Sequence, residues 1–309
     1  MLVTGAGGFI GKHLVNELLR DGFEVAALDK VVRPKTLPGS KKLAYYQDDV
    51  NRPNSWWRSK PGTRIVHLAA NTSVQESVRR PLPTVRANVE ATCRMLEFAR
   101  KIDSERFVFA STAAIYGEKR LSCRETDAPA PASPYAASKL ASEYYCKVYA
   151  SLYGIPTVVL RYFNVYGPGQ SDHYAGVITR FVREALRGKP PVIFGDGRQT
   201  RDFVFIQDVI RATVASVTQQ VPGGTILNIG TGRATSILSL ARQVLHIFDL
   251  KTLRPIHASR QVGEVRHSQA NISEARMKIR FRPKYRLSEG LPPTIEWLRS
   301  VASPSRAST

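Results

Sequence analysis

A tyrosine and a lysine four residues apart form the first pair in this sequence with clear chemical potential. They lie in the segment SPYAASK (133–139), which has the pattern of a helix start. Residues i and i+4 share one helix face, so the ammonium of Lys139 can approach the phenol of Tyr135. A cation about 4 Å away contributes roughly 4 kcal/mol at an effective dielectric near 20, which lowers a phenol pKa by up to about three units. The pair therefore predicts an acid–base group, although this spacing also occurs by chance on surface helices.

Hydroxyl side chains occur where another β-rich run ends. The segment FASTAAIYG (109–117) places Ser111 and Thr112 at the end of an expected buried strand. The carboxyl ends of parallel strands form the edge at which doubly wound sheets bind their ligands. We therefore expect these hydroxyls at a ligand-binding edge.

A glycine-rich loop near the N-terminus predicts a dinucleotide site. The segment GAGGFIG places Gly5, Gly8 and Gly11 between a strand and a helix. Such glycines permit a tight turn, close approach of the backbone to a pyrophosphate, and close helix packing. The helix start adds unpaired N–H groups and a partial positive charge. The next strand ends in Asp29, whose carboxylate can bind ribose hydroxyls and would repel a 2′-phosphate, so NAD is favoured over NADP.

A parallel sheet must hold these groups, and the front half of the chain has the matching pattern. Short β-rich runs alternate with longer helical stretches, which is typical of a doubly wound α/β (Rossmann) fold. Strands are expected at 2–4, 25–28, 64–68, 106–110 and 157–161, and a helix at 9–21. The segments 203–217 and 227–229 are expected to return to the main sheet.

The domain prediction follows from a change in amino-acid composition after residue 164, where glycine and proline become frequent. We expect a NAD-binding Rossmann domain of 1–163 and 204–232, a smaller C-terminal α/β substrate-binding domain of 164–203 and 233–302, and a frayed tail at 303–309.

Composition excludes several classes of protein. The 309 residues are 43% hydrophobic and 23% charged, which excludes a disordered chain, and no apolar run is long enough for a membrane span. The formal charge of +20 favours nucleic acid or anionic membrane, but no basic run exceeds two residues, and an anionic substrate explains the charge equally well. The three cysteines lack metal-ligand spacing, and no signal peptide is visible. We expect a cytoplasmic protein with reduced thiols and no metal, nucleic-acid or membrane partner.

Taken in order, the motifs resemble the extended short-chain dehydrogenase/reductase superfamily, and within it the NAD-dependent nucleotide-sugar epimerases of the UDP-glucose 4-epimerase type. The resemblance rests on GxxGxxG, the acidic strand end, Leu68-Ala69-Ala70, ST-AAxYG and SPYxxSK. It continues through RYFNVYGPGQ (161–170), GDGRQTRDFVFIQDV (195–209), NIGTG (228–232) and GEVRHSQA (263–270), and so covers nearly the whole chain.

The resemblance implies a role for individual residues. Tyr135 matches the catalytic base, Lys139 the residue that binds the nicotinamide ribose, and Thr112 the hydroxyl that hydrogen-bonds the reacting sugar. The other implied cofactor contacts are Gly5, Gly8, Phe9, Ile10, Gly11, Asp29, Asp49 and Val50 (at the adenine edge), Leu68, Ala69, Ala70, Asn88 and Phe163. The other implied substrate contacts are Asn164 and Arg201 at the diphosphate, Val192 and Phe194 at the uracil, Glu264 at the ribose, and Ser268 as a gate beside the sugar.

Two departures from the family pattern bear on the reaction. A second diphosphate arginine is replaced by Gln261, with Arg260 beside it. The dehydratase and decarboxylase branches carry Asp-Glu or Ser-Glu after the catalytic Thr, and here these positions are Ala113 and Ala114. The implied reaction is inversion of C4 of a UDP-hexose through a 4-keto intermediate. UDP-glucuronate epimerase, reductase and dehydratase activities remain alternatives, as do a non-catalytic NAD-binding regulator and a basic nucleic-acid-binding protein.

The resemblance and the helix pattern support two further expectations. The small gate Ser268 leaves space for an acetamido group, so both UDP-glucose/UDP-galactose and their N-acetyl forms are expected substrates, unless Arg266 or His267 refills the space. The helix after Tyr135 carries two apolar stripes, which predict a homodimer unless both are buried within a monomer. One stripe is Leu140, Tyr144, Val148 and Leu152, and the other is Tyr145, Tyr149 and Tyr153. One of them is expected to face the sheet and the other a partner, together with a companion helix that carries Val89, Cys93, Met95 and Leu96.

Overall fold

Seven parallel strands form the central sheet of the computed structural model, which describes residues 1–52, 60–119, 121–170, 176–260 and 265–302. Their order is β11 (Thr225–Ile229), β6 (Thr157–Tyr162), β5 (Phe107–Thr112), β4 (Ile65–His67), β1 (Leu2–Thr4), β2 (Val25–Asp29) and β3 (Leu43–Gln47). Every residue of β1, β4 and β6 is buried, as expected for strands covered by helices on both faces. The predicted doubly wound α/β class is confirmed.

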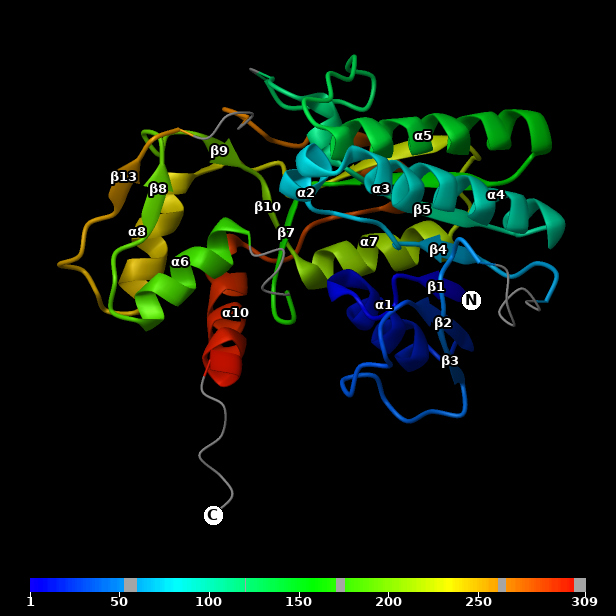
Figure 1. Ribbon diagram of the computed structural model, residues 1–309, viewed down its shortest axis with the longest axis horizontal. Coiled ribbons are helices and arrows are strands. Elements are labelled where there is room, and N and C mark those ends of the chain that lie inside the picture. The colour runs from blue at the N-terminus through cyan, green and yellow to red at the C-terminus, as the bar shows by residue number, and fades with distance from the viewer. Residues whose placement is uncertain (53–59, 120, 171–175, 261–264, 303–309) are drawn as a thin grey trace.

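Helices cover both faces of this sheet (Figure 1). The helices α1 (Phe9–Arg20) and α7 (Ile206–Thr218) pack against each other on one face. The helices α4 (Ala91–Lys101) and α5 (Pro134–Tyr153) cover the other. The short α2 (Val74–Arg79), α3 (Pro81–Val85) and π-helical η2 (Arg86–Glu90) precede α4, and the 3-10 helix η3 (Ala113–Tyr116) follows β5. No helix in the described ranges has the length and hydropathy needed to cross a membrane.

A smaller lobe lies beside the carboxyl edge of the sheet (Figure 1). It contains α6 (Val177–Leu186), α8 (Ile237–Ile247), α10 (Leu287–Ala302) and two pairs of short strands. These pairs are β8 (Val192–Phe194) with β13 (Ile256–Ala258), and β9 (Thr200–Arg201) with β12 (Thr235–Ser236). A further pair, β7 (Asn164–Tyr166) with β10 (Phe203–Phe205), contacts α7 of the larger lobe and α10 of the smaller one. The remaining helix, α9 (Ser273–Ile279), packs on β11 and α7 of the larger lobe.

The strand predictions hold with two corrections. Residues 203–205 form β10, which pairs with β7 in a separate two-stranded sheet and does not join the main sheet. Only the helical part of 203–217 reaches the main sheet, because α7 packs on β5 and β6. The prediction missed β3, an edge strand whose polar and aromatic residues are mostly partly exposed and lack a buried apolar pattern.

The predicted interface residues are only partly at the surface. Met95 and Leu96 are fully buried in the core between α4 and the sheet, so they cannot face a partner, which corrects that part of the prediction. The α5 residues Tyr144, Val148 and Leu152 are instead 56%, 45% and 69% exposed, which excludes the alternative that both stripes are buried within one chain.

Local signals explain why α5 begins and ends where it does. The hydroxyl of Ser133 accepts a hydrogen bond from the backbone N–H of Ala136 at 3.1 Å, and Pro134 occupies the first helical position. The helix ends at Gly154, which adopts the left-handed conformation with φ of 68°. These caps place the first two turns of α5 beside the carboxyl end of β5.

Candidate active site

The strand order reverses between β1 and β4, and a crevice at this point is where doubly wound sheets bind ligands. Gly5 follows β1 with φ of 69°, and a Cβ there would lie 2.7 Å from the backbone nitrogen of Ala69. A Cβ on Gly11 would lie 2.1 Å from the carbonyl oxygen of Gly5. Both glycines are therefore required by close backbone contacts, as the loop motif predicts.

The start of α1 has the features of an anion site. Its N-cap, Gly8, provides no side-chain cap, and its first turn contains no acidic residue. The N-terminal N–H groups and helix dipole thus favour a phosphate. Phe9 and Ile10, the first two residues of the helix, are partly buried. A bound dinucleotide fits this arrangement.

Asp29 lies at the end of β2 beside the loop. Its carboxylate accepts hydrogen bonds from the backbone N–H groups of Gly7 at 2.8 Å and Val31 at 3.2 Å. Burial and the charge of Asp29 raise the pKa of the neighbouring Tyr45 to about 12. The carboxylate is partly exposed, so it retains capacity for ribose hydroxyls.

Other predicted cofactor residues lie along the same edge. Asp49 forms an ion pair with Lys30 at 3.0 Å; burial would raise its pKa, but hydrogen bonds from Asn51 and Lys30 lower it overall. Val50 is buried in the core, and the ring of Phe163 packs in a buried cluster, so both side chains serve packing. The predicted Leu68, Ala69 and Ala70 follow β4 and are partly buried.

Asn88 links the loop after Ala70 to α5 through hydrogen bonds. Its side chain accepts a hydrogen bond from the backbone N–H of Asn71 at 2.8 Å and donates to Ser138 at 2.9 Å. It lies in the π-helical segment η2, and such bulges are often found at functional sites. The structure thus places Asn88 behind Tyr135 and Lys139 on α5.

A buried histidine beside the crevice was missed by the motif analysis. His67 ends β4, and its Nδ1 lies 2.7 Å from the hydroxyl of Thr4, which accepts a hydrogen bond from Ala69 N–H. Burial, together with the charge of Lys139, lowers the pKa of His67 to about 3, so the ring is neutral. The signal in the sequence was a polar residue in the otherwise apolar segment IVHLAA.

Tyr135, Lys139 and Thr112 meet at the carboxyl end of β5. Burial raises the pKa of Tyr135 to about 12, and a hydrogen bond with Thr112 partly offsets this. The Lys139 ammonium donates to the carbonyl of Ala110 at 2.7 Å and lies 4.6 Å from the centre of the Phe109 ring. Burial therefore dominates the pKa of Tyr135 in this structure, and the lowering expected from Lys139 together with a bound cationic nicotinamide stays a prediction.

The electrostatic state of Lys139 is unusual for a lysine. Burial lowers its pKa to about 8, although Cys146 and Glu143 raise it. A protonated lysine in this dry space stabilises any negative charge that forms on the neighbouring phenol. The three side chains can therefore exchange a proton with a bound hydroxyl group.

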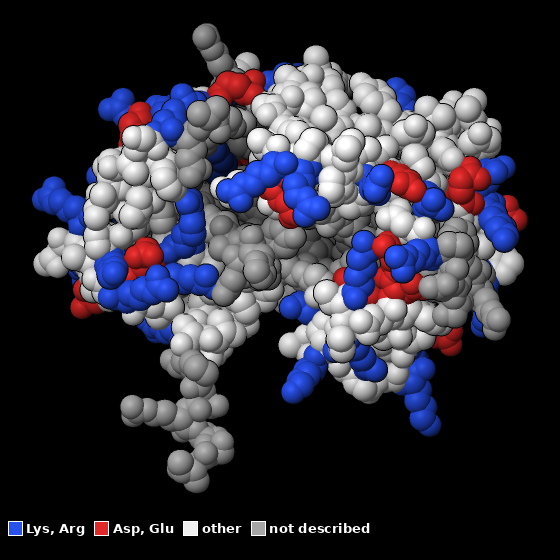
Figure 2. All heavy atoms as spheres, in the orientation of Figure 1, with Lys and Arg blue, Asp and Glu red and all other residues white. Residues whose placement is uncertain are grey.

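Two cavities in the smaller lobe contain most of the predicted substrate residues. One of about 180 Å³ is lined by Asn164, Val192, Phe194 and Arg201, together with Arg180 and others. A second, of about 250 Å³, shares Phe194 and is also lined by Arg260 and Arg266. Figure 2 shows Lys and Arg side chains on this lobe and beside the hollow next to it. Anionic ligands are favoured there.

Some of the predicted substrate residues do not line these cavities or lie outside the described ranges. Glu264 and Gln261 lie outside the described residues. Ser268 is partly buried and does not line either cavity. The motif analysis missed Arg180, whose guanidinium carbon lies 5.3 Å from the centre of the Phe194 ring, and the ion pair between Arg266 and Asp196 at 2.6 Å. The described residues contain no cluster of three or more His, Cys, Asp or Glu suited to a metal.

Comparisons with known proteins agree with this geometry. The profile of the family described as "NAD dependent epimerase/dehydratase family" matches residues 1–230. The chain is 36% identical to UDP-glucose 4-epimerase of Mycolicibacterium smegmatis over 310 residues, covering 97% of this chain and 98% of that protein. The structure of UDP-glucose 4-epimerase from Thermotoga maritima with UDP-glucose is similar, with a TM-score of 0.90, 35% identity, and coverage of 98% and 99%. The structure of MoeE5 with UDP-glucuronic acid and NAD has a TM-score of 0.88, 37% identity, and coverage of 97% and 99%.

The buried ammonium predicts a specific dependence of stability on pH. The folded pKa of Lys139 is about 8, against 10.5 for an unperturbed lysine, so the unfolded chain binds more protons between these values. Stability contributed at this site should therefore rise with pH from about 8 to 10.5, by roughly 3 kcal/mol in all. We expect this rise in the free energy of unfolding of the wild type relative to Lys139→Met, measured by urea denaturation.

Lys147→Met, at an exposed position of α5, is the control for the change of residue type. If the difference in free energy of unfolding between the wild type and Lys139→Met stays constant from pH 8 to 10.5, the burial of a titrating ammonium is contradicted.

Proposed function

The chain belongs to the NAD-dependent epimerase/dehydratase family, and on that basis we propose that it is an isomerase that inverts C4 of a UDP-hexose through a 4-keto intermediate. The observation that carries the proposal is the hydrogen-bonded pair of Tyr135 and Thr112, with Lys139 beside it, at the end of β5. Relatives with UDP-glucose epimerase names support the same reaction class.

The residues around the crevice fit NAD, the cofactor of this family. The uncapped start of α1 would hold the pyrophosphate, Asp29 the adenosine ribose, and Lys139 the nicotinamide ribose. When bound, NAD+ supplies the acceptor for the hydride of the sugar carbon and then returns it, so no external reductant is consumed. The carboxylate of Asp29 disfavours a 2′-phosphate, which supports NAD over NADP.

The protein groups supply the proton transfer. Thr112 would orient the sugar hydroxyl toward Tyr135, and the phenolate form of Tyr135 would take its proton as the carbonyl forms. The same proton returns when the carbonyl is reduced from the opposite face. The ammonium of Lys139 lowers the cost of the phenolate in a space that excludes water.

The side chains next to Thr112 argue against loss of water or carbon dioxide. Ala113 and Ala114 begin η3, and the N–H of Ala114 donates to Thr112 at 3.2 Å. Their methyl groups can neither give nor take a proton. A second candidate is C4 epimerisation of UDP-glucuronate, which the likeness to MoeE5 bound to UDP-glucuronic acid favours.

The two lobes would divide the substrate between them. We assign the nucleotide-sugar-binding domain to 164–203 and 233–302, and the NAD-binding domain to 1–163 and 204–232. Asn164 and Arg201 would bind the diphosphate, and Val192 and Phe194 the uracil, because all four line one cavity. Arg260, in the adjoining cavity, would replace the arginine that is absent at position 261. The assignment of the substrate ribose to Glu264 rests on the sequence motif.

We also propose that the protein is cytoplasmic. All three cysteines are free thiols, two of them buried, which supports a reducing, cytoplasmic environment.

Removing the phenol oxygen tests the reaction directly. Tyr135→Phe should reduce kcat at least about 100-fold, because only the proton-transfer group is lost, and should leave NAD and UDP-sugar affinity nearly unchanged. Turnover of UDP-glucose and UDP-galactose is measured by separation of the epimers, with absorbance recorded for free NADH.

Tyr149→Phe is the matched control, because the hydroxyl of Tyr149 on α5 donates a hydrogen bond to the carboxylate of Glu97 at the surface. A Tyr135→Phe variant that keeps more than a tenth of the wild-type rate, or stoichiometric NADH in the wild type, would refute the mechanism.

The sugar selectivity is proposed to depend on Ser268. Its small side chain would leave room for an acetamido group, so UDP-N-acetylhexosamines should be accepted as well as UDP-hexoses. Ser268→Tyr should then suppress N-acetylhexosamine turnover much more than hexose turnover, as judged from kcat/KM on both substrates. Ser273→Tyr, at an exposed position, controls for the added ring. Equal losses on both substrates would exclude a gate at this position.

We also propose a homodimer through α5 and the short helix α3. Tyr145 and Tyr153 of α5 are 43% and 49% exposed, and Leu82 and Val85 of α3 are 71% and 44% exposed. An apolar face of this kind usually marks an interface.

Light scattering should give a mass about twice the 34.3 kDa of one chain, and Val148→Asp with Leu152→Glu should shift it to one chain. Met277→Glu, at an exposed apolar residue of α9, should leave the mass unchanged. A wild-type mass near that of one chain would rule out the dimer.

A further inference from the structure

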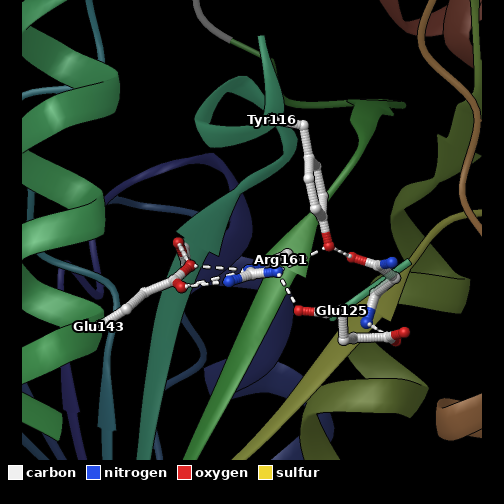
Figure 3. A network of polar contacts seen from close by, with 6 residues as sticks. Tyr116, Glu125, Glu143 and Arg161 are labelled. Atoms are coloured by element: carbon white, nitrogen blue, oxygen red, sulfur yellow. Dashed lines mark hydrogen bonds and ion pairs between the residues drawn. The ribbon is translucent and has the colours of Figure 1, made fainter. Parts of the chain in front are cut away.

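A buried polar network joins α5, β6 and η3 around Arg161 (Figure 3). The guanidinium of Arg161, on β6, donates to both carboxylate oxygens of Glu143, on α5, with a shortest distance of 2.7 Å. The other end of the guanidinium donates to the hydroxyl of Tyr116 at 2.7 Å and to the backbone carbonyl of Glu125 at 3.1 Å. The Tyr116 hydroxyl then donates to Asn228 on β11 at 2.7 Å.

Both charges of this ion pair are removed from water. The side chains of Arg161 and Glu143 are 5% and 3% exposed. Burying two charges costs several kcal/mol per ion, and apolar residues of similar volume usually stabilise a fold at least as well. Stability alone therefore does not account for an ion pair at this place.

The position of the network suggests what it does. Glu143 lies one helical turn after Lys139 and two turns after Tyr135, so the three residues share one face of α5. Its carboxylate also accepts a hydrogen bond from Ser111, the residue before Thr112 on β5. The same carboxylate thus binds the helix that carries Tyr135 and Lys139 to the strand that carries Thr112.

The arginine is held from the side opposite to the carboxylate. Its guanidinium carbon lies 4.9 Å from the centre of the Tyr116 ring, and Tyr116 is fully buried. Asn228 is fixed in turn, because its amide donates to the carbonyls of Cys123 and Asn271. Arg161 therefore has few alternative orientations, which is what a rigid support requires.

We propose that Glu143 and Arg161 are positioning residues that hold α5 in register with the end of β5, so that Tyr135 and Lys139 stay aligned with Thr112. The proposal rests on the proposed function, because it assigns the network to the same catalytic groups. Both side chains are almost fully buried, so each would act through the residues that contact the ligands. The charge of Glu143 also favours the protonated form of Lys139.

Glu143→Gln tests the proposal while keeping the volume of the side chain. Misplacement of catalytic groups by a fraction of an ångström should reduce kcat about 10- to 100-fold. The KM for the UDP-sugar should stay within about twofold, because the nucleotide binds in the other lobe. The Kd for NAD+, measured by calorimetry, should rise about fivefold, because Lys139 is held less firmly where it binds the nicotinamide ribose.

An apolar replacement separates positioning from packing. Glu143→Leu combined with Arg161→Met should fold with a thermal midpoint close to that of the wild type, yet keep the low kcat and weakened NAD+ binding of Glu143→Gln. Recovery of both quantities in this double variant would overturn the proposal, since packing alone would then suffice.

Two further variants complete the test. Ser111→Ala breaks the link between Glu143 and β5 but spares the ion pair, and should lower kcat severalfold; if the other variants do not fold, an unchanged kcat here overturns the proposal. Tyr162→Phe is the matched control, because it removes a buried hydrogen bond to Thr213 on the opposite face of β6 and should leave kcat and NAD+ affinity within about twofold. A wild type that turns over no nucleotide sugar would refute the proposed function, while the NAD+ affinities would still decide the role of Glu143.

Discussion

The packing of α5 against β5 and β6 is the constraint on which the site depends. It brings a phenol, an ammonium and a hydroxyl into one space that excludes water, at the carboxyl edge of a parallel sheet. In that space the charged forms of Tyr135 and Lys139 are both costly, and each depends on the other and on the bound ligands. Ser133 caps the start of this helix, and the ion pair between Glu143 on α5 and Arg161 on β6 links the helix to the sheet.

In the proposed function, the larger lobe carries the chemistry and the smaller lobe recognises the substrate. Backbone groups at the start of α1 and the carboxylate of Asp29 form a site for a dinucleotide on the sheet. The cavities of the smaller lobe are lined by arginines and by the ring of Phe194, which suit a diphosphate and a base. An enzyme that inverts C4 must bind the nucleotide firmly and the sugar weakly, because the keto sugar has to rotate and expose both of its faces to the hydride donor.

Much of this arrangement could be predicted because it depends on local pattern. The glycine loop, the strand that ends in Asp29 and the spacing of Tyr135 and Lys139 each encode their own geometry over a few residues. The failures have a common physical cause in tertiary contacts. The sequence does not show that burial raises the pKa of Tyr135, that β10 pairs with β7, or that Met95 and Leu96 face the core. The pairing of Glu143 with Arg161 joins residues on different elements, so no local spacing reveals it.

Inversion of C4 by removal and return of the same hydride can be followed with an isotope. The protein is incubated with UDP-glucose that carries deuterium at C4, and the UDP-galactose formed is analysed by NMR and mass spectrometry. We expect the deuterium to be retained at C4 in the inverted product, with no deuterium lost to water and no free NADH formed. Loss of the label to solvent, or product formed only with stoichiometric NADH, would contradict it.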